Sequence, residues 1–211
     1  MHALRSVAVA AALVAASMTP VRAHAPDGAA FVAAFRAVCL PQRLSYDGMI
    51  DLAGSLGWRT VVPGSSEELA AILKLADDAI AKNDGDVRMA RSAFERVVAG
   101  KLHHLLLSHI VAPEAPAVTS CALYDFGATE QIDAQLVTDV VGVEQKRYFV
   151  NDGFHAYSWG VTPAMPGTFQ TVLTFVAEDS PHVEKTGFSG LVLKIDSTDP
   201  DAVKAEPDAK D

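Results

Sequence analysis

Residues 145–159 decide the fold: Gln-Lys-Arg-Tyr-Phe-Val-Asn-Asp-Gly-Phe-His-Ala-Tyr-Ser-Trp. Two runs rich in aromatic and β-branched residues, 145–150 and 154–159, flank Asn-Asp-Gly at 151–153. Asn-Gly and Asp-Gly sequences favour the positive φ angles of a tight hairpin turn. This stretch therefore predicts two antiparallel strands joined by a short turn.

The pattern continues toward the C-terminus. Residues 169–176 alternate apolar and polar side chains, and residues 190–195 place Leu191, Leu193 and Ile195 on one face. The connections between these four strands are too short for crossover helices, which parallel strands would need. We therefore expect the C-terminal half to be mostly antiparallel β-sheet.

The first half of the chain has helical periodicity instead. Apolar side chains recur at three- and four-residue spacing over 28–39 and 46–56. Ser65 with Glu68 predicts a capping box that opens a helix reaching about residue 82. A fourth helix is expected from Thr129 to Gly142.

The segment from 86 to 126 is less regular. We expect a loop or short helix over 87–91, extended chain ending in a strand over 101–110, and a returning strand over 118–126. The whole chain is thus predicted to be α+β, with N-terminal helices packed on one face of an antiparallel sheet of about six strands.

Length and composition fit a single globular domain, with 211 residues of which 50% are hydrophobic. Residues 1–23 have a basic start, a 12-residue apolar run from Val7 to Met18 and a small-residue exit. This is typical of a secretory signal peptide and shorter than the ~20 residues of a membrane-spanning helix. We expect cleavage after Ala23, because cleavage after Ala25 would place Pro26 first.

The expected domain therefore covers residues 24–195, and residues 196–211 form an acidic, disordered tail. Losing Arg5 and Arg22 with the signal peptide leaves 15 basic residues against 26 acidic residues, a formal charge of −11. Such a charge disfavours nucleic acid and anionic membranes as partners. We predict no membrane span after signal cleavage.

Cys39 and Cys121 are the only cysteines. Export would place both in an oxidising compartment, so we predict a disulfide between them. Two buried thiols or one nucleophilic cysteine are the alternatives.

Three histidines, His103, His104 and His109, invite a metal interpretation that their spacing does not favour. On a strand, His103 and His109 share a face ~20 Å apart and His104 points the other way. A mature N-terminal His24 resembles the copper-binding residue of the copper-dependent polysaccharide oxygenases, but those enzymes are β-sandwiches and this chain begins with helices. We predict no metal and no cofactor.

One candidate ligand face remains. His155, Tyr157 and Trp159 alternate onto one face of the strand over 154–159. Aromatic rings with polar groups at this spacing can stack a sugar or a peptide. The alternative is that this face packs against the helices, as large aromatic side chains usually do.

No sequence motif identifies a catalytic residue: Gly-x-Ser-x-Gly, Ser-x-x-Lys, His-Glu-x-x-His and a phosphate-binding glycine loop are all missing from the chain. Whether the protein is an enzyme therefore stays open. We expect a non-catalytic binding or accessory protein with a protein or small-molecule ligand. The alternative is a hydrolase whose site is assembled only in the fold.

The order of features resembles that of small exported proteobacterial proteins of unknown function. These features are the signal peptide, the helical start with one cysteine, Gly57-Trp58, and Ser120-Cys121 in a strand-rich second half. The resemblance implies a periplasmic or secreted location in a bacterium. It implies no catalytic residue.

Overall fold

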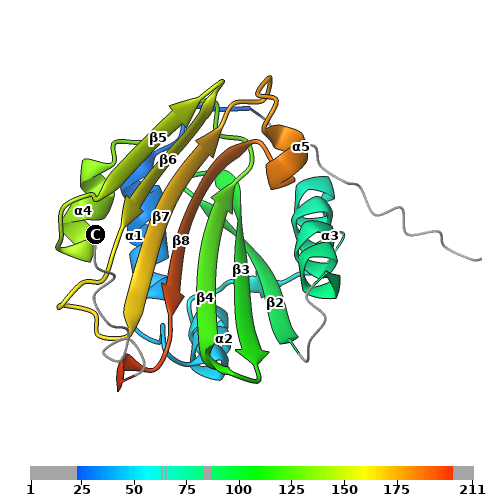
Figure 1. Cartoon of the computed structure of the whole chain (residues 1–211). Coiled ribbons are helices and arrows are strands. Elements are labelled where there is room, and N and C mark those ends of the chain that lie inside the picture. The colour runs from blue at the N-terminus through cyan, green and yellow to red at the C-terminus, as the bar shows by residue number, and fades with distance from the viewer. Residues whose placement is uncertain (1–22, 63, 65, 83–86, 202–211) are drawn as a thin grey trace, which may run out of the picture.

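The computed structural model describes residues 23–62, 64, 66–82 and 87–201 (Figure 1). Eight antiparallel strands form one sheet in the order β1-β2-β3-β4-β8-β7-β6-β5. The strands are β1 (Arg59–Thr60), β2 (Arg88–Val98), β3 (Lys101–Ala112), β4 (Ala115–Asp125), β5 (Arg147–Asn151), β6 (Phe154–Trp159), β7 (Thr168–Val176) and β8 (Gly190–Ser197). The helices are α1 (Gly28–Cys39), α2 (Tyr46–Ser55), α3 (Glu67–Ala81), α4 (Gln135–Val141) and α5 (Val183–Thr186).

The helices α1, α2 and α4 cover one face of the sheet, which we call the α1 face. Figure 1 shows α1 behind strands β6 to β8, α4 at the β5 side of the sheet, and α2 behind the lower end of β4. Their apolar residues pack with inward side chains of the central strands into one core cluster, which includes Phe31, Phe35, Leu123, Leu193 and Trp159. Side-chain caps begin the first two helices, with Asp27 accepting from the Ala30 N–H and Ser45 from the Gly48 N–H.

The helix α3 packs on the opposite face, which we call the α3 face. Its Leu69 and Leu73 join a second, smaller cluster with Tyr124, Phe126 and Phe188. Because strand side chains alternate between faces, each central strand contributes to both clusters.

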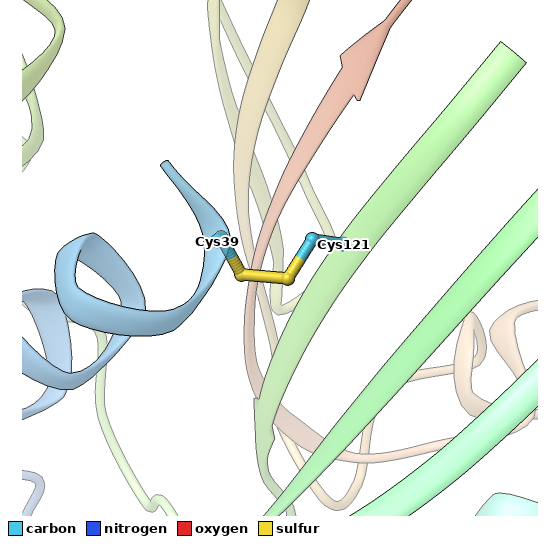
Figure 2. The surroundings of a disulfide bond; sticks show 2 residues. All are labelled: Cys39 and Cys121. Carbon is cyan, nitrogen blue, oxygen red and sulfur yellow. A yellow bond between two sulfur atoms is a disulfide. The ribbon is translucent and has the colours of Figure 1, made fainter. Parts of the chain in front are cut away.

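The two cysteines form the predicted bridge (Figure 2). Cys39 lies at the end of α1 and Cys121 on β4, with their Cα atoms 5.6 Å apart. Both residues are buried in the α1-face cluster. The bridge therefore holds α1 on the sheet across 82 residues of sequence.

The α+β class and the antiparallel sheet are confirmed, but the strand number and the helix placement need correction. The sheet has eight strands rather than about six, and helices lie on both faces and in both halves of the chain. Residues 88–91, expected as a loop or short helix, belong to β2. Four of the eleven residues of β2 are charged, and its turn to β3 uses Ala99 at φ 48°, a residue that does not signal such a turn.

Three boundaries also differ from the sequence prediction. Ser66, not Ser65, caps α3 by accepting from the Leu69 N–H, and α4 begins at Gln135 rather than near Thr129. The strand β8 runs to Ser197, two residues into the predicted tail. Residues 202–211 and the predicted signal residues 1–22 lie outside the described residues.

Candidate functional site

The hairpin of β5 and β6 builds the candidate ligand face. Asp152 and Gly153 form its turn with φ angles of 43° and 76°, the conformation that the Asn-Asp-Gly sequence predicts. The turn sets the register, so Tyr148 pairs with Tyr157 and Val150 with His155. His155, Tyr157 and Trp159 share the α1 face of β6, as expected.

Trp159 belongs to the core and is not available to a ligand. Its side chain is fully buried, and the indole Nε1–H donates to Thr138 Oγ1 of α4 at 3.0 Å. The indole thus fixes α4 on the sheet. Of the three predicted residues, only His155 and Tyr157 retain partly exposed side chains.

Tyr148 on β5 completes the surface. Its ring stacks on Tyr157 with centroids 4.5 Å apart and 22° between planes, and lies 6.2 Å from the His155 ring at 27°. The Tyr148 hydroxyl and His155 Nδ1 are 3.0 Å apart, and 48% of Tyr148 is exposed. We call Tyr148, His155 and Tyr157 the tyrosine platform.

The Tyr157 phenol of the platform is uncharged at neutral pH. The Tyr157 hydroxyl donates to Gln131 Oε1 at 2.7 Å. Burial, followed by the neighbouring Tyr148 and Asp133, raises the pKa of Tyr157 to about 12. The Tyr157 hydroxyl therefore stays protonated and acts as a hydrogen-bonding group beside exposed ring surface.

The three histidines of β3 divide between the two faces, as the strand prediction requires. His103 lies against Phe31 and His109 against Tyr46 on the α1 face, whereas His104 lies against Phe126 on the α3 face. Among the described residues, no three His, Cys, Asp or Glu side chains are arranged to hold a metal ion.

Asp125 brings together two histidines that the sequence kept apart. His24 Nε2 lies 2.9 Å and His103 Nε2 3.5 Å from Asp125 Oδ2, and His103 Nδ1 donates to the Lys101 carbonyl at 2.9 Å. Burial is the largest influence on His103 and lowers its pKa. The adjoining cavity holds only about 10 Å³, so this is a buried polar cluster without room for a substrate.

The hydrolase alternative requires a serine or cysteine hydrogen-bonded to a histidine, and the described residues do not contain such a pair among the histidines considered. None of His103, His104, His109 or His155 hydrogen-bonds to a serine or cysteine there, and both cysteines are in the bridge. His109 Nδ1 contacts the Thr119 hydroxyl at 3.2 Å beside a depression of about 570 Å³. Thr119 lines this depression but is 4% exposed.

A second depression, of about 610 Å³, was not signalled by the sequence. Its lining carries the carboxylate of Glu68 from the first turn of α3 and those of the adjacent Glu178 and Asp179 after β7. The sequence did not predict this depression, because no motif or periodic spacing links segments that only the tertiary fold brings together.

Sequence reasoning also missed Tyr148 and Gln131. The signal for Tyr148 was present, because a two-residue turn at 152–153 pairs residue 148 with residue 157. Gln131 approaches Tyr157 from the segment before α4, a contact that only the tertiary fold defines.

Comparison of the chain with protein-family models, with curated proteins and with solved structures finds no match. No helix within the described residues has the length and apolar character needed to cross a membrane. The buried cysteine bridge is compatible with a location outside the cytoplasm.

Proposed function

We propose that this chain is an exported, non-catalytic binding protein of the bacterial envelope, and that the tyrosine platform is its ligand surface. The observation that carries the proposal is the half-exposed Tyr148 ring stacked on Tyr157, with the imidazole of His155 at its hydroxyl. An exposed aromatic stack with polar groups at its edge offers both apolar contact and hydrogen bonds to one ligand.

A neutral carbohydrate fits this surface best. The C–H face of a sugar ring packs against an exposed aromatic ring, and sugar hydroxyls bond to the phenol and imidazole groups at its edge. The formal charge of −11 after signal cleavage disfavours anionic ligands. An extended peptide is the competing ligand class.

Export is supported by the leader sequence and by the place of His24 in the fold. His24 donates its N–H to the Gly127 carbonyl at 2.7 Å and accepts from Thr129 at 2.9 Å, and its side chain contacts Asp125. A mature chain starting at His24 would keep all these contacts. Intact-mass measurement of the exported protein should show a start at His24; retention of residues 1–23 would contradict it.

Ligand binding is tested by calorimetric titration of the purified protein with neutral oligosaccharides and with extended peptides. Tyr148→Ala should abolish carbohydrate binding, and Tyr148→Phe should weaken it by removing only the hydroxyl. Val161→Ala is the matched control, because Val161 is 49% exposed and lies outside the platform.

Carbohydrate binding that Tyr148→Ala leaves unchanged would refute the platform as the site. Binding of peptides alone would mean that the ligand is a peptide rather than a carbohydrate. Binding of neither class by the parent protein would overturn the proposed function.

A further inference from the structure

The strand β5 leaves one edge of the sheet open. It is last in the strand order, and within the described residues β6 is its only strand partner. All five of its residues are exposed, including Tyr148 at 48%, Phe149 at 55% and Val150 at 52%.

The opposite edge strand, β1, has two residues and pairs with β2 only at Phe94 and Glu95. Proteins usually protect an open edge with proline, charged side chains or a bulge. The strand β5 has no proline and one charged residue, Arg147, and the Lys146 N–H just before it donates inward to the Ser158 carbonyl.

The hairpin register determines which backbone groups of β5 face outward. Asn151 and Phe154 flank the two-residue turn and form the first hydrogen-bonded pair of the hairpin. Hydrogen-bonded positions alternate along an antiparallel strand, so Phe149 also bonds toward β6. The N–H and C=O groups of Tyr148 and Val150 therefore point away from the sheet.

We infer that β5 pairs antiparallel with β5 of a second copy of this chain, on a two-fold axis at Phe149. Tyr148 then exchanges both backbone hydrogen bonds with Val150 of the second copy, and the reverse pair does the same. Phe149 lies opposite Phe149 of the second copy as a non-hydrogen-bonded pair, in which side chains are close. Two eight-stranded sheets become one continuous sheet.

The length of β5 selects this register over its neighbours. Pairing around Phe149 aligns all five residues of the strand, with Arg147 opposite the neutral Asn151 at both ends. Centring on Tyr148 or on Val150 aligns only three of them, because the Lys146 N–H donates back to the Ser158 carbonyl at 2.8 Å and Asp152 lies in the hairpin turn. One-residue shifts mismatch outward and inward backbone groups.

The pairing adjoins the proposed carbohydrate site, because Tyr148 belongs to both, and the two proposals are separated by their variants. A two-fold axis perpendicular to the sheet keeps both α1 faces on the same side, so the two tyrosine platforms lie beside each other on one surface. Phe149 lies on the opposite face of β5 from Tyr148, so Phe149→Lys tests the pairing by mass, and Tyr148→Phe, which keeps the backbone of β5, tests the carbohydrate site by calorimetry.

The first test is the mass of the purified, disulfide-bonded protein by sedimentation or light scattering. The parent should have twice the mass of the chain, and Phe149→Lys should halve it. Val97→Lys is the control, because Val97 is an apolar strand residue of similar exposure, 61%, on β2. A monomeric parent, or a dimer that Phe149→Lys leaves intact, would overturn the inference. Thermal melts of both variants check that they fold.

The second test fixes the register by cysteine cross-linking. A non-hydrogen-bonded pair has Cα atoms ~4.5 Å apart, within the range of a disulfide, so Phe149→Cys should oxidise to a covalent dimer. Val150→Cys, at similar exposure, should not, because the two copies of residue 150 are offset along the strands. Efficient cross-linking of Val150→Cys with none of Phe149→Cys would contradict the proposed register.

Discussion

The two faces of the sheet differ in how much apolar surface they carry and in how many helices cover it. The α1 face is apolar along the central strands, with Leu191, Leu193 and Ile195 of β8 buried under three helices and a disulfide. On the α3 face the same strand presents Val192, Lys194 and Asp196. A single long helix covers part of that face. In β8, large apolar residues alternate with a mixture of apolar and charged residues. This alternation in the strand sequence specifies which face of the sheet carries the main core.

The uncovered part of the α3 face is polar and internally satisfied. Ser120 donates to the buried Asp196, and Lys194 Nζ lies 3.0 Å from the other carboxylate oxygen. A buried carboxylate is tolerated only with such partners. The α3 face therefore requires less helical cover than the α1 face.

The largest expected effect comes from removing the bridge that holds α1 on its face. Replacing Cys39 and Cys121 together by alanine should lower the free energy of unfolding by ~2–5 kcal/mol, because the unfolded chain regains the freedom of a long loop. A denaturant melt beside the parent measures it. Alkylation without reductant should label neither cysteine of the parent; full labelling of both would contradict the bridge.

Trp159→Ala should be destabilising to the same extent. The indole is fully buried on the α1 face and holds α4 through Thr138, so its loss should cost ~3–5 kcal/mol. Tyr157→Ala on the same strand is the control and should cost less, because Tyr157 is partly exposed. A loss below ~1 kcal/mol for Trp159→Ala would contradict its assignment to the core.

A matched pair of leucines compares the two faces directly. Leu193 on the α1 face and Leu69 on the α3 face are both fully buried. We expect Leu193→Ala to cost ~4 kcal/mol and Leu69→Ala ~2 kcal/mol, since a single helix can relax into the space left behind more easily than a bridged, three-helix layer. Equal costs in chemical denaturation would show that the two faces are equally rigid.

The sequence predicted those parts of this structure that local signals define. The Asn-Asp-Gly turn, the apolar stripe of α1, and the faces of His103 and His104 on β3 are examples, because each follows from spacing along one element. The start of β2, residues 88–91, was assigned to a loop or short helix because its Arg and Ala residues have low strand propensity; pairing with β3 holds it in the sheet.

The site was harder to predict because it depends on contacts between distant segments. The sequence placed His155, Tyr157 and Trp159 on one face and left open whether that face binds a ligand or packs against the helices. That Trp159 alone of the three is fully buried depends on where Thr138 of α4 packs. Asp125 carries no local signal, yet it lies against His24 and His103, residues 101 and 22 positions away. Contacts of this kind join residues far apart in the sequence, so residue spacing along one element does not predict them.

The smallest expected effect concerns protonation on the α3 face. His104 is 2% exposed, and its Nδ1 has no hydrogen-bond partner among the described residues. Burial lowers the pKa of His104 more than the nearby Glu95 and Glu68 raise it. The unfolded chain therefore takes up a proton near pH 6.5 while the folded protein does not, and the free energy of unfolding falls as the pH drops below this value.

Replacing His104 by phenylalanine, which can pack against Phe126, should remove this contribution. The free energy of unfolding of the variant should then fall less steeply between about pH 6.5 and 5 than that of the parent, by up to ~1.4 kcal/mol per pH unit for one proton. His103 persists in both proteins and Asp125 holds its ring, so the difference isolates His104. Denaturant melts across this range provide the measurement. Parallel profiles for parent and variant would mean that His104 takes up its proton equally in the folded and unfolded states, and that the α3 face over Phe126 is open to water.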